Sequence, residues 1–92
     1  MAKFVSVHIT TCMTRQDIDR LIRRFLNEAT DKVRLVRLQS NTIEGRMVCE
    51  WEADDKEAVV GWLSQRNVRF RGNEEWIIRV QMETVDGKLV HV

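Results

Sequence analysis

The sequence predicts a single α+β domain, residues 1–92, whose elements follow the order β-α-β-β-α-β. Apolar and polar residues alternate in four segments, which is the period of a strand, and apolar residues recur every three to four positions in two others, which is the period of a helix. The chain contains no proline that would interrupt these segments. This order is that of a ferredoxin-like sandwich, in which two helices cover one face of a four-stranded antiparallel sheet.

The first half of the chain supplies a strand, a helix and a second strand. Aliphatic residues occupy every second position of the predicted strand 4–10. Thr14 and Asp17 have the spacing of a capping box, and helical periodicity continues to Ala29. A second strand is expected over 33–39, where the apolar residues change parity midway, as a β-bulge requires. The pattern leaves the facing of this strand open.

The second half repeats this pattern. A third strand is expected over 46–53, and Asp54 with Glu57 predicts the start of a second helix that ends at Asn67. A long fourth strand, 76–83, follows after a turn at Gly72 and Asn73.

The end of the chain predicts a hairpin. Asp86 and Gly87 are typical of a tight turn between two strands. Residues 89–92 therefore form a short fifth strand, which either returns to an edge of the sheet or is lent to a second subunit.

The facing of the strands decides where a site can lie. We expect the third strand to turn Met47, Cys49, Trp51 and Ala53 toward the helices. The open face should then carry Phe4, His8, Val48 and Ile77 among charged residues. Apolar groups there would be poorly placed in water, and a chain of this length buries only about 60 to 65% of its surface on folding. Both points favour a homodimer formed through the sheet face.

Charge and composition exclude several classes of partner. Fifteen basic and fourteen acidic residues give a net charge of +1, which leaves no electrostatic excess for nucleic acid or an anionic membrane. RNA-binding domains of this element order need stacking aromatics on the third strand, where Arg46 and Val48 stand. No apolar run approaches the ~20 residues of a membrane span. We expect a cytoplasmic protein whose Cys12 and Cys49 are separate thiols.

One candidate ligand site lies on the open face. If the strands are ordered 4-1-3-2, the first strand lies between the third and the fourth, so His8 would meet Glu50 or Glu52 on one side and Arg79 or Gln81 on the other. A histidine between a carboxylate and a guanidinium can orient a polar ligand or act as an acid or base. The alternative is a solvated row of cross-strand pairs.

Cys12 is a second candidate. It lies just before the first helix, where amide groups and the helix dipole lower the pKa of a thiol. His8, four residues earlier, and Met13, immediately after, add further soft donors, and this set suits nickel, copper or zinc. The segment lacks a complete set of metal ligands, so the alternative is a loop cysteine and a sheet histidine.

The segment from Cys49 to Val59, CEWEADDKEAV, resembles the strand-to-helix junction of a family of small bacterial proteins described as uncharacterised or nickel-binding. The resemblance implies a ferredoxin-like fold, association through the sheets as in dimeric α+β barrels, and a transition-metal or small-ligand site. Gly61 and Trp62 stand where those relatives often have a histidine, so no metal ligand is carried over.

These observations predict a homodimeric domain that binds a small ligand or a metal, with His8, Glu50 and Arg79 as ligand-binding residues and Cys12 at the rim. Two alternatives remain. One is a cofactor-free enzyme of the dimeric α+β barrel kind, a monooxygenase or an isomerase, with His8 as acid or base. The other is an interaction module without a ligand.

Overall fold

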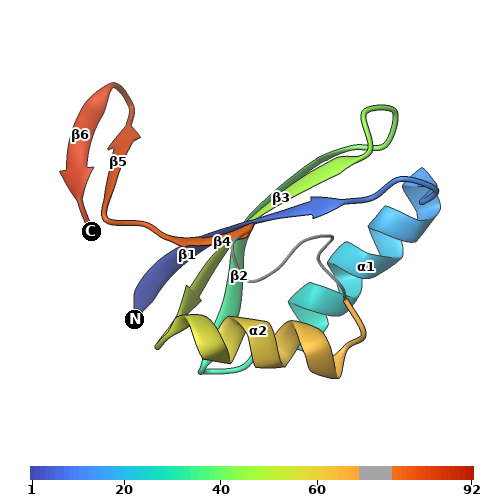
Figure 1. Ribbon diagram of the computed structural model, residues 1–92, viewed down its shortest axis with the longest axis horizontal. Coiled ribbons are helices and arrows are strands. Elements are labelled where there is room, and N and C mark those ends of the chain that lie inside the picture. Colours follow the sequence, from blue (N-terminus) through green and yellow to red (C-terminus); the bar gives the residue numbers. More distant parts are fainter. Residues whose placement is uncertain (69–75) are drawn as a thin grey trace.

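The computed structural model describes residues 1–68 and 76–92. Its main sheet has four antiparallel strands in the order β2-β3-β1-β4, as predicted (Figure 1). The turn expected at Gly72 and Asn73 lies outside the described residues. In chain order the elements are β1 (Ala2–Ile9), α1 (Arg15–Asn27), β2 (Val33–Asn41), β3 (Arg46–Ala53), α2 (Lys56–Gln65), β4 (Ile77–Arg79), β5 (Met82–Val85) and β6 (Lys88–His91).

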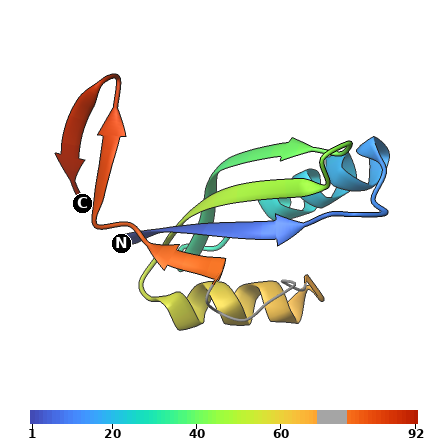
Figure 2. The ribbon, with the colours of Figure 1, turned by 45° about the horizontal axis from the view of Figure 1, so that its top comes forward.

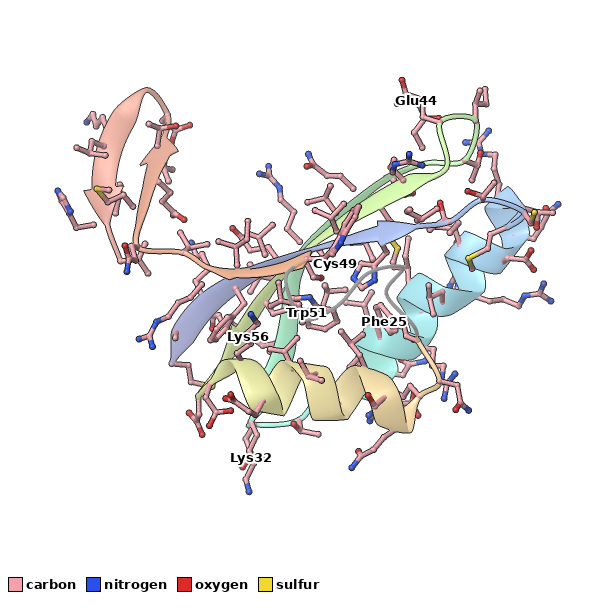
Figure 3. All side chains as sticks on the ribbon, viewed as in Figure 1. Phe25, Lys32, Glu44, Cys49, Trp51 and Lys56 are labelled. Atoms are coloured by element: carbon pink, nitrogen blue, oxygen red, sulfur yellow. The ribbon has the colours of Figure 1, made fainter. Side chains whose placement is uncertain are left out.

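Both helices lie on the same side of the main sheet (Figures 1 and 2). Three aromatic rings connect the layers. The ring centroid of Trp51 in β3 is 5.5 Å from that of Phe25 in α1 and 5.3 Å from that of Trp62 in α2. Figure 3 shows Cys49, Trp51 and Phe25 in the space between sheet and helices. The core lies on this side, and no helix formed by residues 1–68 or 76–92 lies on the opposite side of the sheet, here called the open face.

Each helix begins at an acceptor side chain. Thr14 Oγ1 accepts from the Asp17 amide while the Asp17 carboxylate accepts from the Thr14 amide, which confirms the predicted capping box. The second helix starts one residue later than predicted. Asp55, not Asp54, has the extended backbone of an N-cap, and its carboxylate accepts from the Ala58 amide.

The parity change in β2 is a β-bulge, as predicted. The pairing with β3 shifts between Leu35 and Arg37, so Val36 is the extra residue. Val33 and Leu35 are buried on the helix side, which settles the facing of this strand and places Arg37 opposite Glu50.

The predicted facing of β1 is wrong. Its buried residues are Phe4, Ser6 and His8, each at most 2% exposed. They lie opposite the residues of β3 that face the helices, so the register fixes their direction. Val5 and Val7 lie on the open face. Alternation shows that two faces differ, but it does not say which of them meets the helices.

The predicted fourth strand is broken into two parts. β4 pairs with β1, and its facing is again the reverse of the expectation: Ile77 is 3% exposed and Ile78 is 60% exposed. The amide of Val80 still donates to the carbonyl of Lys3 over 2.9 Å. Beyond that bond the chain leaves the sheet.

The last two strands form a hairpin of their own. Asp86 and Gly87 have φ angles of 51° and 76°, which confirms the predicted tight turn. The strand expected over 89–92 exists as β6, but it pairs with β5 in a separate two-stranded sheet rather than with an edge of the main sheet. The hairpin projects on the side of the main sheet opposite the helices (Figures 1 and 2).

Candidate functional site

The structure does not bring His8, Glu50 and Arg79 together. His8 faces the helices and is 2% exposed. Glu50 lies on the open face, opposite Val5. Arg79 lies opposite Phe4, so the strand alternation places it on the helix side of the sheet. Its side chain is nevertheless exposed. Within one chain, these three residues therefore do not line a common ligand site.

His8 belongs instead to a set of hydrogen bonds inside the core. The indole Nε1 of Trp51 donates to Ser6 Oγ over 2.8 Å, and the same oxygen lies 2.8 Å from His8 Nε2. The Ser6 hydroxyl can accept from the indole and donate to a neutral imidazole at the same time. Burial lowers the pKa of His8 from 6.5 to about 4, so the ring is uncharged near neutral pH.

The two thiols have opposite surroundings. Cys49 is fully buried, and this burial raises its pKa to about 12, although a hydrogen bond with Ser6 acts in the opposite direction. Its thiol is therefore protonated and shielded. Cys12 is exposed and has a left-handed backbone with φ 74°, a conformation that few residues other than glycine and asparagine adopt readily.

The structure separates the two residues of the predicted metal pair, His8 and Cys12. His8 points into the core, whereas Cys12 lies on the surface. Across residues 1–68 and 76–92 there is no group of three or more histidine, cysteine, aspartate or glutamate side chains that could hold a metal ion.

A groove of about 1050 Å³ runs between the first half of α1 and the end of the β2–β3 hairpin. Its apolar part comes from Ile18 and Ile22 of the helix and from Ile43, which is 96% exposed. Charged and polar groups complete the lining: Arg15, Gln16, Asp19, Arg20, Ser40, Asn41 and Thr42.

The charges of this groove are not equivalent. Arg20 is paired with Asp17 at 2.7 Å, and Asp19 is paired with Arg23 at 2.9 Å. No carboxylate in the described ranges pairs with Arg15. The groove therefore combines an apolar strip with one guanidinium that is available to a ligand, which suits a small organic anion.

The open face of the sheet has an apolar centre. Val5, Val7 and Ile9 of β1 are half-buried there, and Val48 of β3 and Ile78 of β4 are 38% and 60% exposed. Monomeric proteins expose few contiguous apolar patches of this kind, and such patches mark interaction sites.

Charged side chains border this apolar centre. Lys3 Nζ lies 2.8 Å from the carboxylate of Glu83 and 3.8 Å from that of Glu50. The hydrogen bond to Glu83 is the main cause that raises the pKa of Lys3. Arg37 is exposed on this face and pairs with no carboxylate of the described chain.

Sequence reasoning missed both the groove and the composition of the open face. The aliphatic alternation of Val5, Val7 and Ile9 is a signal for an apolar face, but alternation alone does not tell which side of the sheet that face occupies. The groove combines residues about 25 positions apart, and no motif links Arg15 with Asn41.

Two helices over one face of a four-stranded antiparallel sheet, followed by a separate hairpin, define a small α+β domain. The crystal structure of the protein SCO4226 from Streptomyces coelicolor A3(2) is similar, with a TM-score of 0.74 over 90% of this chain and 100% of that chain, at 19% sequence identity. The two proteins thus share a fold. No family model and no curated protein matches the sequence. Neither α1 nor α2 has the length and apolar character of a membrane-spanning helix.

Proposed function

We propose that the protein is a homodimeric binding domain with a ferredoxin-like fold, in which two copies pack their open faces together. The observation that supports this most directly is the apolar centre of the open face, where Val48 and Ile78 are exposed and on which no helix of the described chain lies (Figure 1). A helix-free sheet face with apolar residues in the middle and charges at the border has the anatomy of an interface. A second copy also supplies the burial that a 92-residue domain lacks.

Val48→Asp tests the assembly. The residue points away from the core, so the fold should persist while the dimer dissociates, because a carboxylate would be desolvated in the interface. Leu26→Asp is the matched control, since Leu26 is 58% exposed on α1. Sedimentation velocity over a range of concentrations should show a dimer for the wild type and the control and a monomer for Val48→Asp. A wild-type protein that stays monomeric at high concentration contradicts the proposal.

The groove along α1 favours a second element of the function, the binding of a small organic anion. The apolar strip of Ile18 and Ile22 would take the body of the ligand, and Arg15 would pair with its carboxylate or phosphate. His8 is buried and neutral, so the geometry supports binding in this groove rather than acid or base chemistry at that residue.

Phenylacetate and its uncharged amide are suitable probes for this groove. Saturation-transfer NMR should detect phenylacetate and not phenylacetamide, and Arg15→Gln should weaken the signal, whereas Arg23→Gln on the outer face of α1 should not. Equal signals from the two probes would contradict the assignment. The experiment is independent of the oligomeric state.

The remaining expectations form part of the same proposal. Both cysteines are free thiols, which suits the reducing cytoplasm. The resemblance of residues 49–59 to small bacterial proteins described as uncharacterised or nickel-binding leaves a transition metal as a second ligand class. Native mass spectrometry of the purified protein reports bound metal and subunit number together.

A further inference from the structure

The β5–β6 hairpin extends away from the domain and is held at its base by few bonds. The carboxylate of Glu83 accepts from Lys3 Nζ over 2.8 Å and 3.0 Å, and the amide of Val92 donates to the carbonyl of Gln81 over 2.9 Å. Apart from Glu83, every residue of β5 and β6 is exposed. A two-stranded hairpin is marginally stable alone in water, so this one needs a surface to pack on.

The hairpin has two different sides. Paired residues share a side, so Glu83, Val85 and Val90 lie together, while Met82 and Leu89 lie on the other side. Glu83 contacts Lys3, which belongs to the open face. The side with Val85 and Val90, 47% and 38% exposed, therefore turns toward the space over the open face. Hairpin and open face together form the two walls of a corner (Figure 2).

We infer that the hairpin is a dimerisation arm that packs against the open face of a second copy of this chain. The inference rests on the homodimer proposed above and adds the segment that completes its interface. Sheets that pack face to face lie about 10 Å apart. Four residues per strand at about 3.4 Å each, plus the turn, make the hairpin long enough to cross that gap and reach the second sheet.

Charge complementarity identifies where the tip of the arm docks. Asp86 stands at the turn and has no cationic partner in the described chain, and Arg37 on the open face has no anionic one. In a symmetric dimer, Asp86 of each copy would pair with Arg37 of the other, which gives two equivalent ion pairs.

Charge reversal tests this pairing between chains. Asp86→Lys alone and Arg37→Glu alone place like charges at both contacts, so each should raise the dimer dissociation constant about tenfold. An equimolar mixture should form a heterodimer of nearly wild-type affinity, because both of its contacts are again opposite in charge. Asp31→Lys and Lys32→Glu, exposed between α1 and β2, are the controls and should have no effect.

Native mass spectrometry with one variant isotopically labelled reports the heterodimer directly. Dimers of both variants as tight as the wild type would overturn the inference. A mixture no tighter than the separate variants would overturn it as well.

A second pair of variants does not disturb the turn. Val90→Asp lies on the inner side of the hairpin and should weaken the dimer, whereas Leu89→Asp on the outer side should not. If both substitutions weakened the dimer equally, the result would contradict the assignment of the inner side of the hairpin to the interface.

The outcomes also separate this inference from the proposed function. If Val48→Asp dissociates the dimer while Val90→Asp and the charge reversals leave it intact, the homodimer stands and the arm is refuted. A wild-type chain that is monomeric throughout refutes both.

Discussion

Ser6 and His8, two residues apart on β1, meet inside the core with Ser6 Oγ 2.8 Å from His8 Nε2. The same oxygen accepts from Trp51 on the neighbouring strand. One hydroxyl therefore satisfies polar groups from two strands in a region that water does not reach.

Ser6→Ala should lower the free energy of unfolding by about 1 to 3 kcal/mol, because it leaves the Trp51 indole and the His8 ring without this buried partner. Urea denaturation followed by tryptophan fluorescence measures the change. Ser64→Ala, on the exposed side of α2, is the control and should not destabilise the protein. A Ser6→Ala protein as stable as the wild type would show that these hydrogen bonds make no net contribution to the free energy of unfolding.

Stability should fall as the pH drops from 6.5 toward 4. The folded protein lowers the pKa of His8 from 6.5 to about 4, so between these values the unfolded chain binds a proton that the folded chain does not. The contribution is present above pH 6.5 and is lost on acidification, by about 2 kcal/mol between pH 7 and pH 5. Unfolding midpoints in urea at the two pH values measure it.

His8→Gln should flatten this pH dependence, whatever its effect on stability at pH 7. His91, which is exposed, offers the matched control: His91→Gln should leave the wild-type profile unchanged. A profile that is equally steep in His8→Gln would assign the proton uptake to other groups.

The two cysteines should react at very different rates with a disulfide reagent. Cys12 is exposed, while Cys49 is 0% exposed with its pKa raised to about 12. Reaction requires a thiolate that the reagent can reach, so Cys49 should react only as fast as the core opens. The release of thiol from the reagent should show one fast phase with the wild-type protein. Cys12→Ser should remove this fast phase. If both cysteines of the native protein reacted in the fast phase, the result would contradict the burial of Cys49 in the core.

Arg66 should stabilise the end of α2. Its Cζ lies 3.8 Å from the centre of the Trp62 ring, and its Nη1 donates to the Trp62 carbonyl over 3.0 Å. Arg66→Ala should cost about 1 kcal/mol of stability and change the tryptophan emission. Arg66→Lys keeps the charge but not the flat stacking group, and it should recover only part of the loss. Arg23→Ala, on the solvent side of α1, should change neither quantity.

The sequence predicted the features that depend on neighbouring residues. The capping box of Thr14 and Asp17, the bulge near Val36 and the turn at Asp86 are each encoded within a few positions. The strand order followed from the order of the elements, because few arrangements of two helices and four strands bury both apolar stripes.

The facing of β1 could not be predicted in this way, because it depends on a partner 45 positions away. The Trp51 indole needs a buried acceptor, and Ser6 supplies it only if Phe4, Ser6 and His8 turn toward the helices. That choice sends Val5 and Val7 to the open face and moves His8 out of the expected ligand site. The break after β4 was missed because no glycine or proline marks Val80 and Gln81.

The two ends of the chain are neighbours in space. Met1 and Val92 line one shallow hollow together with Lys3, next to the base of the hairpin. A purification tag at either end would occupy the region where a second copy is expected to dock, and a weakened association could then be mistaken for a property of the protein. The same proximity suits circular permutation, with a short linker between Val92 and Met1 and new ends at the exposed residue Glu44.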